Sequence, residues 1–266
     1  MESLGQPIAQ GRTAQIFPWK DGRVVKLYFD FMNPDEAEFE ARINAEMHAA
    51  GMPAPGEVEM VEVEGRKGVL FERVEGPTLL QAMAAKPWRI AYYADMMADL
   101  HSQIHQASLG WLRDIRGYFY WAIEHGPEGL PEEQRQQVLE RLRQMPETDG
   151  VCHGDYHPEN IVLSKRGPVI LDWLTACRGR AAADVARTCM MLKVGKPTGA
   201  MNPVLEFGRR VFLDRYLRTY FRKTGLSMAE VDAWMPVIAA ARRRENIEGE
   251  ESSLLEMVAN GLAQNS

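Results

Sequence analysis

The sequence predicts an α+β fold in which a small antiparallel sheet with one helix precedes a larger, mainly helical lobe. Short alternating apolar segments broken by glycine fill residues 1–75, whereas apolar residues at helical spacing dominate residues 76–266. The Gly76-Pro77 pair interrupts the pattern between these regions, so we place the lobe boundary there. We therefore expect an N-terminal and a C-terminal lobe, with the functional site in the cleft between them.

Turn residues and apolar spacing predict the elements of the N-terminal lobe. The Asp21-Gly22 pair separates two strand-like runs and is typical of a β-hairpin. Residues 34–50 carry apolar side chains at four-residue spacing, which predicts one helix inserted among strands. Residues 58–64 and 68–74 flank a glycine turn and predict two further strands.

The C-terminal lobe is predicted to be helical with one exception. Apolar stripes and helix-ending residues predict helices at 88–107, 131–144, 181–192, 203–223 and 228–246. Within residues 151–172, however, the short apolar runs NIVL and PVILDW predict a small hairpin inside this lobe.

Composition and charge narrow the class of protein. The 266 residues are 45% hydrophobic and 26% charged, which is ordinary for a soluble globular chain. The formal net charge of −6 offers no basic field, so we expect neither nucleic acid nor membrane as a partner. The three cysteines form no C-x-x-C pair, and no signal peptide or membrane-spanning apolar run is present. We therefore expect a cytoplasmic protein.

The stretch HGDYHPEN, from His153 to Asn160, and the later Asp172 carry the candidate chemistry. Phosphoryl transfer requires a group that positions the acceptor hydroxyl and ligands for a charge-neutralising Mg²⁺. Asp155 can accept the hydroxyl proton, while Asn160 and Asp172 offer the hard oxygen ligands that Mg²⁺ prefers. Their order and spacing match the patterns H-R-D-L-x-x-x-N and D-F-G of kinases. The sequence therefore predicts a Mg²⁺-dependent phosphotransferase that uses ATP or GTP.

The N-terminal lobe supplies candidate ligands for the nucleotide phosphates. Lys26 lies in the strand VVKLY, where such a lysine can bridge the α- and β-phosphates. We expect Glu40 on the following helix to orient Lys26, with Glu36 and Glu46 as alternatives. The preceding loop contains Gly11 but lacks the full G-x-G-x-x-G pattern, so its position before the Lys26 strand is what indicates phosphate binding.

Several motifs spread over most of the chain carry a family resemblance: GRTAQIF, VVKLY, Pro-Ala-Pro after the helix, LFERVEG, ADLHSQIH, HGDYHPEN, ILDW and Asp184-Val185-Ala186. On these motifs the chain resembles the aminoglycoside phosphotransferase family, the branch of the protein-kinase-like fold that includes choline, homoserine and methylthioribose kinases. The resemblance implies a bilobal fold and transfer of the γ-phosphate to a hydroxyl of a small molecule.

The resemblance also implies roles for residues that the chemistry alone does not assign. Phe71, Glu72 and Val74 would form the hinge that binds the adenine edge through backbone groups. Asp184 would brace the catalytic loop.

Two features favour a small acceptor over a protein. Protein kinases of this fold carry a lysine two residues after the catalytic Asp, where this chain has His157. Between Asp172 and Asp184 there is little room for an activation loop, and the A-P-E sequence is absent. We therefore expect no switching by loop phosphorylation. A non-catalytic nucleotide-binding pseudokinase and a protein or lipid kinase stay open as alternatives.

Two histidine patterns could instead indicate a transition-metal site. His153, Asp155 and His157 alternate, but a metal there would leave the predicted phosphate and magnesium ligands unexplained. His101 and His105 stand one helical turn apart, yet the glutamate of H-E-x-x-H is missing. We therefore expect these two histidines to pack or cap against the catalytic loop.

The C-terminal segment is rich in carboxylates: Glu245, Glu248, Glu250, Glu251 and Glu256. By the resemblance this segment borders the acceptor pocket, so it predicts a cationic amine on the acceptor. The adjacent run Arg242–Arg244 predicts, as the alternative, a solvated face or local ion pairing. The sequence names neither the acceptor nor the oligomeric state.

Overall fold

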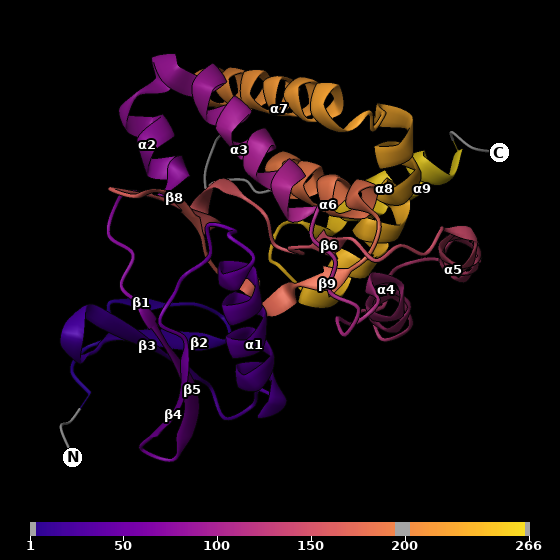
Figure 1. The fold of residues 1–266 in the computed structure, drawn as a ribbon. Coiled ribbons are helices and arrows are strands. Elements are labelled where there is room, and N and C mark those ends of the chain that lie inside the picture. The colour runs from indigo at the N-terminus through magenta and orange to yellow at the C-terminus, as the bar shows by residue number, and fades with distance from the viewer. Residues whose placement is uncertain (1–3, 195–202, 264–266) are drawn as a thin grey trace. The chain divides into compact units, whose positions relative to one another are not determined.

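The computed structural model describes residues 4–194 and 203–263, which divide into two compact units (Figure 1). The first unit runs to Ala82 and also takes in Pro158–Thr175. The second comprises Met83–His157 and the residues from Ala176 onward. This division assigns 158–175 differently from the lobes predicted at residue 76, because the hairpin in that segment packs within the first unit. The predicted functional lobes stay a prediction.

A five-stranded antiparallel sheet in the order β1-β2-β3-β5-β4 forms the base of the first unit. Its strands are β1 (Ala9–Gln10), β2 (Ala14–Pro18), β3 (Arg23–Tyr28), β4 (Glu59–Val63) and β5 (Arg66–Glu72). The turn between β2 and β3 contains Asp21 and Gly22, both at positive φ (59° and 70°). Glu64 and Gly65 do the same between β4 and β5 (53° and 76°), as tight hairpin turns require. The predicted hairpin and strands are confirmed.

Helix α1 (Asp35–Ala49) covers one face of this sheet and confirms the predicted helix. Ala37 and Ala41 share an apolar cluster with Tyr28 of β3, whereas Val25 and Leu27 belong to a cluster on the opposite face. Because side chains alternate along a strand, Lys26 lies on the same face as Tyr28, toward α1.

A second hairpin, β7 (Ile161–Ser164) and β8 (Gly167–Ile170), completes the first unit and was predicted from the runs NIVL and PVILDW. The backbone N–H of Ile170 donates to the carbonyl of Pro53 (2.6 Å), and Val162 forms a β-bridge with Thr78, just before α2 (Leu79–Ala85). Leu174, shortly after the hairpin, packs against the cluster between α1 and the sheet.

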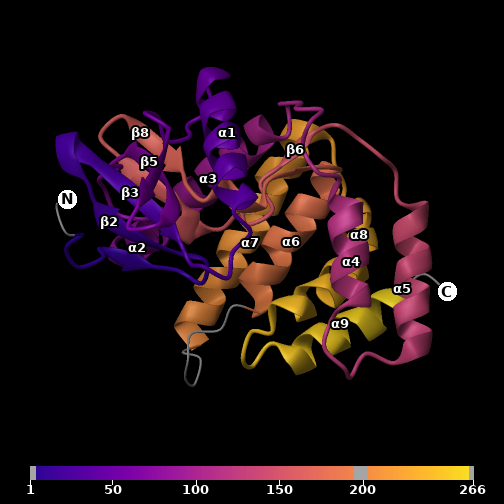
Figure 2. The same cartoon turned by 90° about the horizontal axis from the view of Figure 1, so that it is seen from below.

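The second unit is helical around one buried helix (Figures 1 and 2). Its elements are α3 (Ile90–Ile104), α4 (Ile115–Glu124), α5 (Glu132–Gln144), α6 (Ala181–Val194), α7 (Pro203–Thr224), α8 (Met228–Arg242) and α9 (Glu251–Ala263), with a two-stranded ladder of β6 (Val151–Cys152) and β9 (Cys177–Arg178). α3 packs along α7, and α8 packs against α6 and α9. α6 is buried along most of its length, as an apolar central helix should be.

The predicted helices of this region are confirmed as α3, α5, α6, α7 and α8, with small shifts at their ends. The last of them ends at Arg242, before a 3₁₀ turn and the left-handed Asn246 (φ 49°). No helix within the described ranges combines the length and the apolar character that crossing a membrane requires.

Candidate active site

Lys26 of β3 occupies the centre of the candidate phosphate subsite in the first unit. Its Nζ lies 2.8 Å from Oε2 of Glu40 and 2.9 Å from Oδ1 of Asp172. The hydroxyl of Tyr28, on the same face of β3, also donates a hydrogen bond to Glu40. Three segments far apart in sequence therefore place two carboxylates around one ammonium group.

The charge of Lys26 is secured by these partners. Burial alone lowers the pKa of a lysine, but the carboxylates of Glu40 and Asp172 outweigh that effect and raise the pKa of Lys26 above its ordinary value. Lys26 therefore stays cationic at neutral pH although the residue is only 8% exposed. A fixed positive charge of this kind suits a phosphate group.

Asn160 and Asp172 flank the same end of the β7–β8 hairpin. Ile161 pairs with Ile170, and the N–H of Leu171 donates to the backbone carbonyl of Asn160 (2.8 Å). Strand pairing thus brings two hard oxygen donors, an amide and a carboxylate, to one end of the hairpin, which fits the ligand preference of Mg²⁺.

The backbone of Asp172 is held in an uncommon conformation. Its φ of 60° lies in the left-handed region, which non-glycine residues rarely adopt. Strain of this kind is typical of functional positions. It aims a carboxylate that is 43% exposed and still bonded to Lys26.

The other predicted nucleotide ligands also lie in the first unit. Gly11 is in the turn that joins β1 to β2, and Phe71 is buried near the end of β5. The Glu72 carboxylate pairs with Arg166 of the β7–β8 turn, so its side chain links the two hairpins. Among the described residues, the backbone of Val74 forms no hydrogen bond to the rest of the chain. Their roles stay predictions.

The predicted catalytic loop, which carries Asp155, lies in the second unit directly after β6. Asp184 of α6 accepts hydrogen bonds from the backbone N–H groups of His153 (2.6 Å) and Gly154 (3.0 Å). Gly154 has a φ of 78°, a conformation that suits glycine. Asp184 therefore braces the loop immediately before Asp155.

The next residues on the same face of α6 hold the loop from its carbonyl side. Arg187 donates to the carbonyl of Gly154, and the hydroxyl of Thr188 donates to the carbonyl of Tyr156 (2.9 Å). These residues follow Asp184 by three and four positions, so one helix face reaches both sides of Asp155. Arg187 and Thr188 were not among the predicted site residues. Their positions three and four residues after Asp184, on the same helix face, could have indicated that they also contact the loop.

Two histidines of α3 and two tyrosines of α7 surround the buried Asp184 carboxylate. Nε2 of His101 and Nε2 of His105 lie 3.0 and 3.2 Å from Oδ2 of Asp184. The Nδ1 atoms of these rings each lie 2.6 Å from a hydroxyl oxygen, that of Tyr216 and that of Tyr220 respectively. Burial, reinforced by the neighbouring His105, lowers the pKa of His101 to about 3, so His101 is neutral and donates from Nε2.

These three side chains have the composition of a metal site, but they already hydrogen-bond to one another and to the protein around them. The ligand atoms of His101, His105 and Asp184 lie within 4.8 Å of one another. The two carboxylate oxygens, however, already accept bonds from both histidines and two loop amides. The histidines thus pack against the residue that holds the catalytic loop, in agreement with the sequence-based expectation.

Asp155 itself carries a stabilised negative charge. Its Oδ2 lies 3.5 Å from Nε2 of His157. Burial raises the pKa of this carboxyl, but the hydrogen bond and charge of His157, together with the charge of Arg187, bring it below its ordinary range. Asp155 is therefore ionised at neutral pH and can accept a hydrogen bond from a hydroxyl group.

Of the two readings of Arg242–Arg244, a solvated face is wrong for Arg242 and Arg243, whereas local ion pairing is confirmed for Arg242 with Glu245. Arg242 and Arg243 are 7% and 2% exposed. Arg242 pairs with Glu245 (2.7 Å) and Glu250 (3.0 Å), and Arg243 pairs with Glu251 (2.6 Å). The chain folds back between α8 and α9 and buries both arginines together with Glu245 and Glu250, whereas Glu251 stays 49% exposed. Local charge patterns do not reveal this burial.

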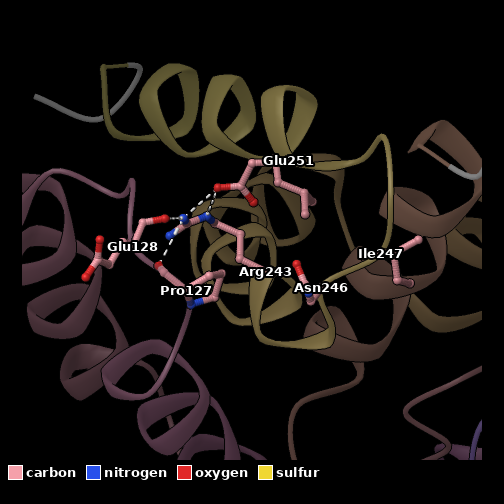
Figure 3. Close-up of a pocket in the computed structure, with 7 residues that line it drawn as sticks. Pro127, Glu128, Arg243, Asn246, Ile247 and Glu251 are labelled. Atoms are coloured by element: carbon pink, nitrogen blue, oxygen red, sulfur yellow. Dashed lines mark hydrogen bonds and ion pairs between the residues drawn. The ribbon is translucent and has the colours of Figure 1, made fainter.

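A polar cavity of about 240 Å³ lies beside the same turn (Figure 3). The guanidinium of Arg243 donates to the backbone carbonyls of Pro127 and Glu128 as well as to Glu251. Its donors therefore bind the wall of the cavity itself.

Comparison with known proteins relates most of the chain to one family. The family model described as "Phosphotransferase enzyme family" matches residues 5–234. No match was found among curated proteins.

Solved structures with a similar fold bind nucleotides and small molecules. A thermostable mutant of aminoglycoside phosphotransferase APH(4)-Ia, in a ternary complex with ADP and hygromycin B, is 15% identical with a TM-score of 0.66, covering 100% of this chain and 95% of that chain. The amicoumacin kinase hAmiN, in complex with AMP-PNP, Ca²⁺ and Ami, is 13% identical with a TM-score of 0.63, covering 98% and 88%. A choline/ethanolamine kinase family protein from Mesorhizobium loti is 15% identical with a TM-score of 0.60, covering 97% and 85%. At these identities the likeness confirms the predicted protein-kinase-like fold.

Proposed function

The chain belongs to the phosphotransferase enzyme family, and from this premise we propose that it transfers the γ-phosphate of ATP or GTP to a hydroxyl of a small molecule. The predicted enzyme class is confirmed by this membership. The observation that supports the finer proposal is the buried Lys26 between Glu40 and Asp172, a fixed cation of the kind that phosphoryl transfer requires.

The nucleotide is proposed to bind to residues of the first unit. Lys26 would contact its phosphates, and Asn160 and Asp172 would hold Mg²⁺. When bound, the ion would neutralise charge on the phosphates. Phe71, Glu72 and Val74 bind the base through backbone groups, and Gly11 lies in the loop over the phosphates.

Asp155 is proposed to act on the acceptor. Its ionised carboxylate accepts the hydrogen bond of the attacking hydroxyl, orients the oxygen and receives the proton during transfer. The bonds from α6 hold the backbone on both sides of Asp155, so the carboxylate is positioned before the acceptor arrives.

A cationic amine on the acceptor stays a prediction, and fewer unpaired carboxylates support it than the sequence suggested. Glu245, Glu250 and Glu251 already form ion pairs with buried arginines, so their charge is largely balanced. Comparing choline and aminoglycosides with neutral sugars, at low and high salt, tests this feature. Preference for a neutral sugar contradicts it.

The experiment is a panel of hydroxylated small molecules incubated with Mg·ATP or Mg·GTP. ADP or GDP release is measured against a reaction without acceptor, and labelled phosphate is followed into metabolite, protein and lipid fractions. Label in the metabolite fraction supports the proposal. Label in protein or lipid supports the alternative kinases, and nucleotide binding without transfer supports a pseudokinase.

The same assay tests the role of Asp155. We expect Asp155→Asn to lower kcat by ~10²–10⁴-fold, because positioning and proton acceptance act on the transition state. Nucleotide affinity, measured by calorimetry, should stay within a few-fold of wild type. Asp172→Asn should instead weaken the Mg²⁺ dependence of nucleotide binding. Wild-type rates in Asp155→Asn would remove this residue from the mechanism.

A further inference from the structure

Arg187 links the catalytic loop to the turn after α8. Its Nε–H donates to the carbonyl of Gly154, and its Nη2 donates to Oε1 of Glu245 (2.7 Å). The side chain is 7% exposed, so both bonds lie in a region that excludes water. Arg187 therefore spans two segments that are far apart in sequence.

The carbonyl that Arg187 binds belongs to the peptide unit that leads into Asp155. The Gly154 carbonyl and the Asp155 N–H belong to one planar peptide unit, and that N–H donates to Nδ1 of His153 (3.3 Å). Because glycine lacks a side chain, steric hindrance does little to restrict rotation at Gly154. Hydrogen bonds must therefore fix the plane, and Arg187 provides the one on the carbonyl side.

Within the part of the chain that the structure describes, the third nitrogen of Arg187 is left without a partner when the other two bind Gly154 and Glu245. Nη1 is buried and has no hydrogen-bond partner among the described residues. An unsatisfied buried donor destabilises the folded state. A lysine would avoid part of that cost, but its single nitrogen lacks the planar fork that reaches a carbonyl and a carboxylate at once.

We propose that Arg187 is a positioning residue for the phosphotransfer reaction, which orients Asp155 by fixing the Gly154 carbonyl against the Glu245 carboxylate. This inference rests on the proposed function. It assigns Glu245 to the support of the catalytic loop.

The test compares Arg187→Lys with Arg243→Lys as a matched control. Arg243 is also buried, pairs with Glu251 and donates to the backbone carbonyls of Pro127 and Glu128 (Figure 3), and none of these bonds involves the catalytic loop. Hydrogen exchange of the 151–157 segment should be about tenfold faster in Arg187→Lys, because its anchor is lost, and unchanged in Arg243→Lys. Equal exchange in both variants overturns the inference.

Kinetics separate positioning from a purely structural role. With Mg·ATP as the probe and water as the acceptor, kcat for ADP release should fall about 10–100-fold in Arg187→Lys with an unchanged KM for ATP. Arg243→Lys should keep the wild-type kcat per folded molecule. A wild-type kcat in folded Arg187→Lys overturns the inference.

Glu245→Gln perturbs the same link from its other end and serves if Arg187→Lys does not fold. It should give faster exchange of the 151–157 segment and a lower kcat, both to a smaller extent, and wild-type values overturn the inference. Failure of the proposed function is distinguishable, since it appears as absence of Mg·ATP binding and ADP release in the wild-type protein. The exchange comparison still decides whether Arg187 anchors the loop.

Discussion

Replacing Asp184 by asparagine should destabilise the fold by about 2–4 kcal/mol. The Oδ1 atom of Asp184 accepts from Gly154, and Oδ2 accepts from His153, His101 and His105. An asparagine has one acceptor oxygen, so its amino group must face at least one of these donors. The less costly orientation leaves Gly154 unpaired, at about 1–3 kcal/mol, and weakens the remaining bonds, which lose a charged acceptor.

The assay is urea unfolding of wild type, Asp184→Asn and Asp95→Asn, followed by fluorescence and circular dichroism. Asp95 on α3 is the matched control, because its side chain is 31% exposed and pairs with Arg215 (2.7 Å) near the surface. Asp95 also accepts from Thr219 and keeps access to solvent, and ion pairs that water can reach contribute less than buried acceptors, so Asp95→Asn should have a smaller effect. If both variants lose the same stability, the reasoning from buried hydrogen-bond acceptors is refuted.

Acidification and thiol chemistry provide two more checks. The pKa of His101 is ~6.5 in the unfolded chain and about 3 in the folded chain, so the unfolded state takes up the proton first as pH falls. The folded state therefore loses about 2 kcal/mol of stability between pH 7.5 and 5. His101→Gln should flatten this dependence of stability on pH, and parallel slopes in the two proteins would contradict it. The cysteines Cys152, Cys177 and Cys189 are buried, and burial raises the pKa of Cys189 to about 12. An aromatic disulfide reagent should therefore label them only upon unfolding, and rapid labelling of the native protein would count against this burial.

Local patterns were sufficient to predict most of the elements. The Asp21-Gly22 turn and the alternation around Lys26 are encoded within a few residues, and the structure contains the corresponding hairpin. The β6–β9 ladder was missed because each strand has two residues and its partner is distant. α4 was missed although Asp114 caps it, since its aromatic residues favour strands when read alone.

The candidate site divides in the same way. Motif spacing selected Asp155, Asn160 and Asp172 as candidates whose roles stay predictions, and the structure places Glu40 beside Lys26. The anchoring role of Arg187 depends on which face of α6 meets the loop. That orientation comes from the packing of the whole unit and not from the local sequence.

The discontinuous first unit has a consequence for synthesis on the ribosome. Residues 158–175 complete this unit, and Leu174 covers part of the cluster beneath α1. The nascent first unit therefore stays incomplete, with apolar surface exposed, until the segment from Met83 to His157 and residues 158–175 have been translated. This departs from the usual order in which an N-terminal domain folds first, and it makes the growing chain a natural client for chaperones.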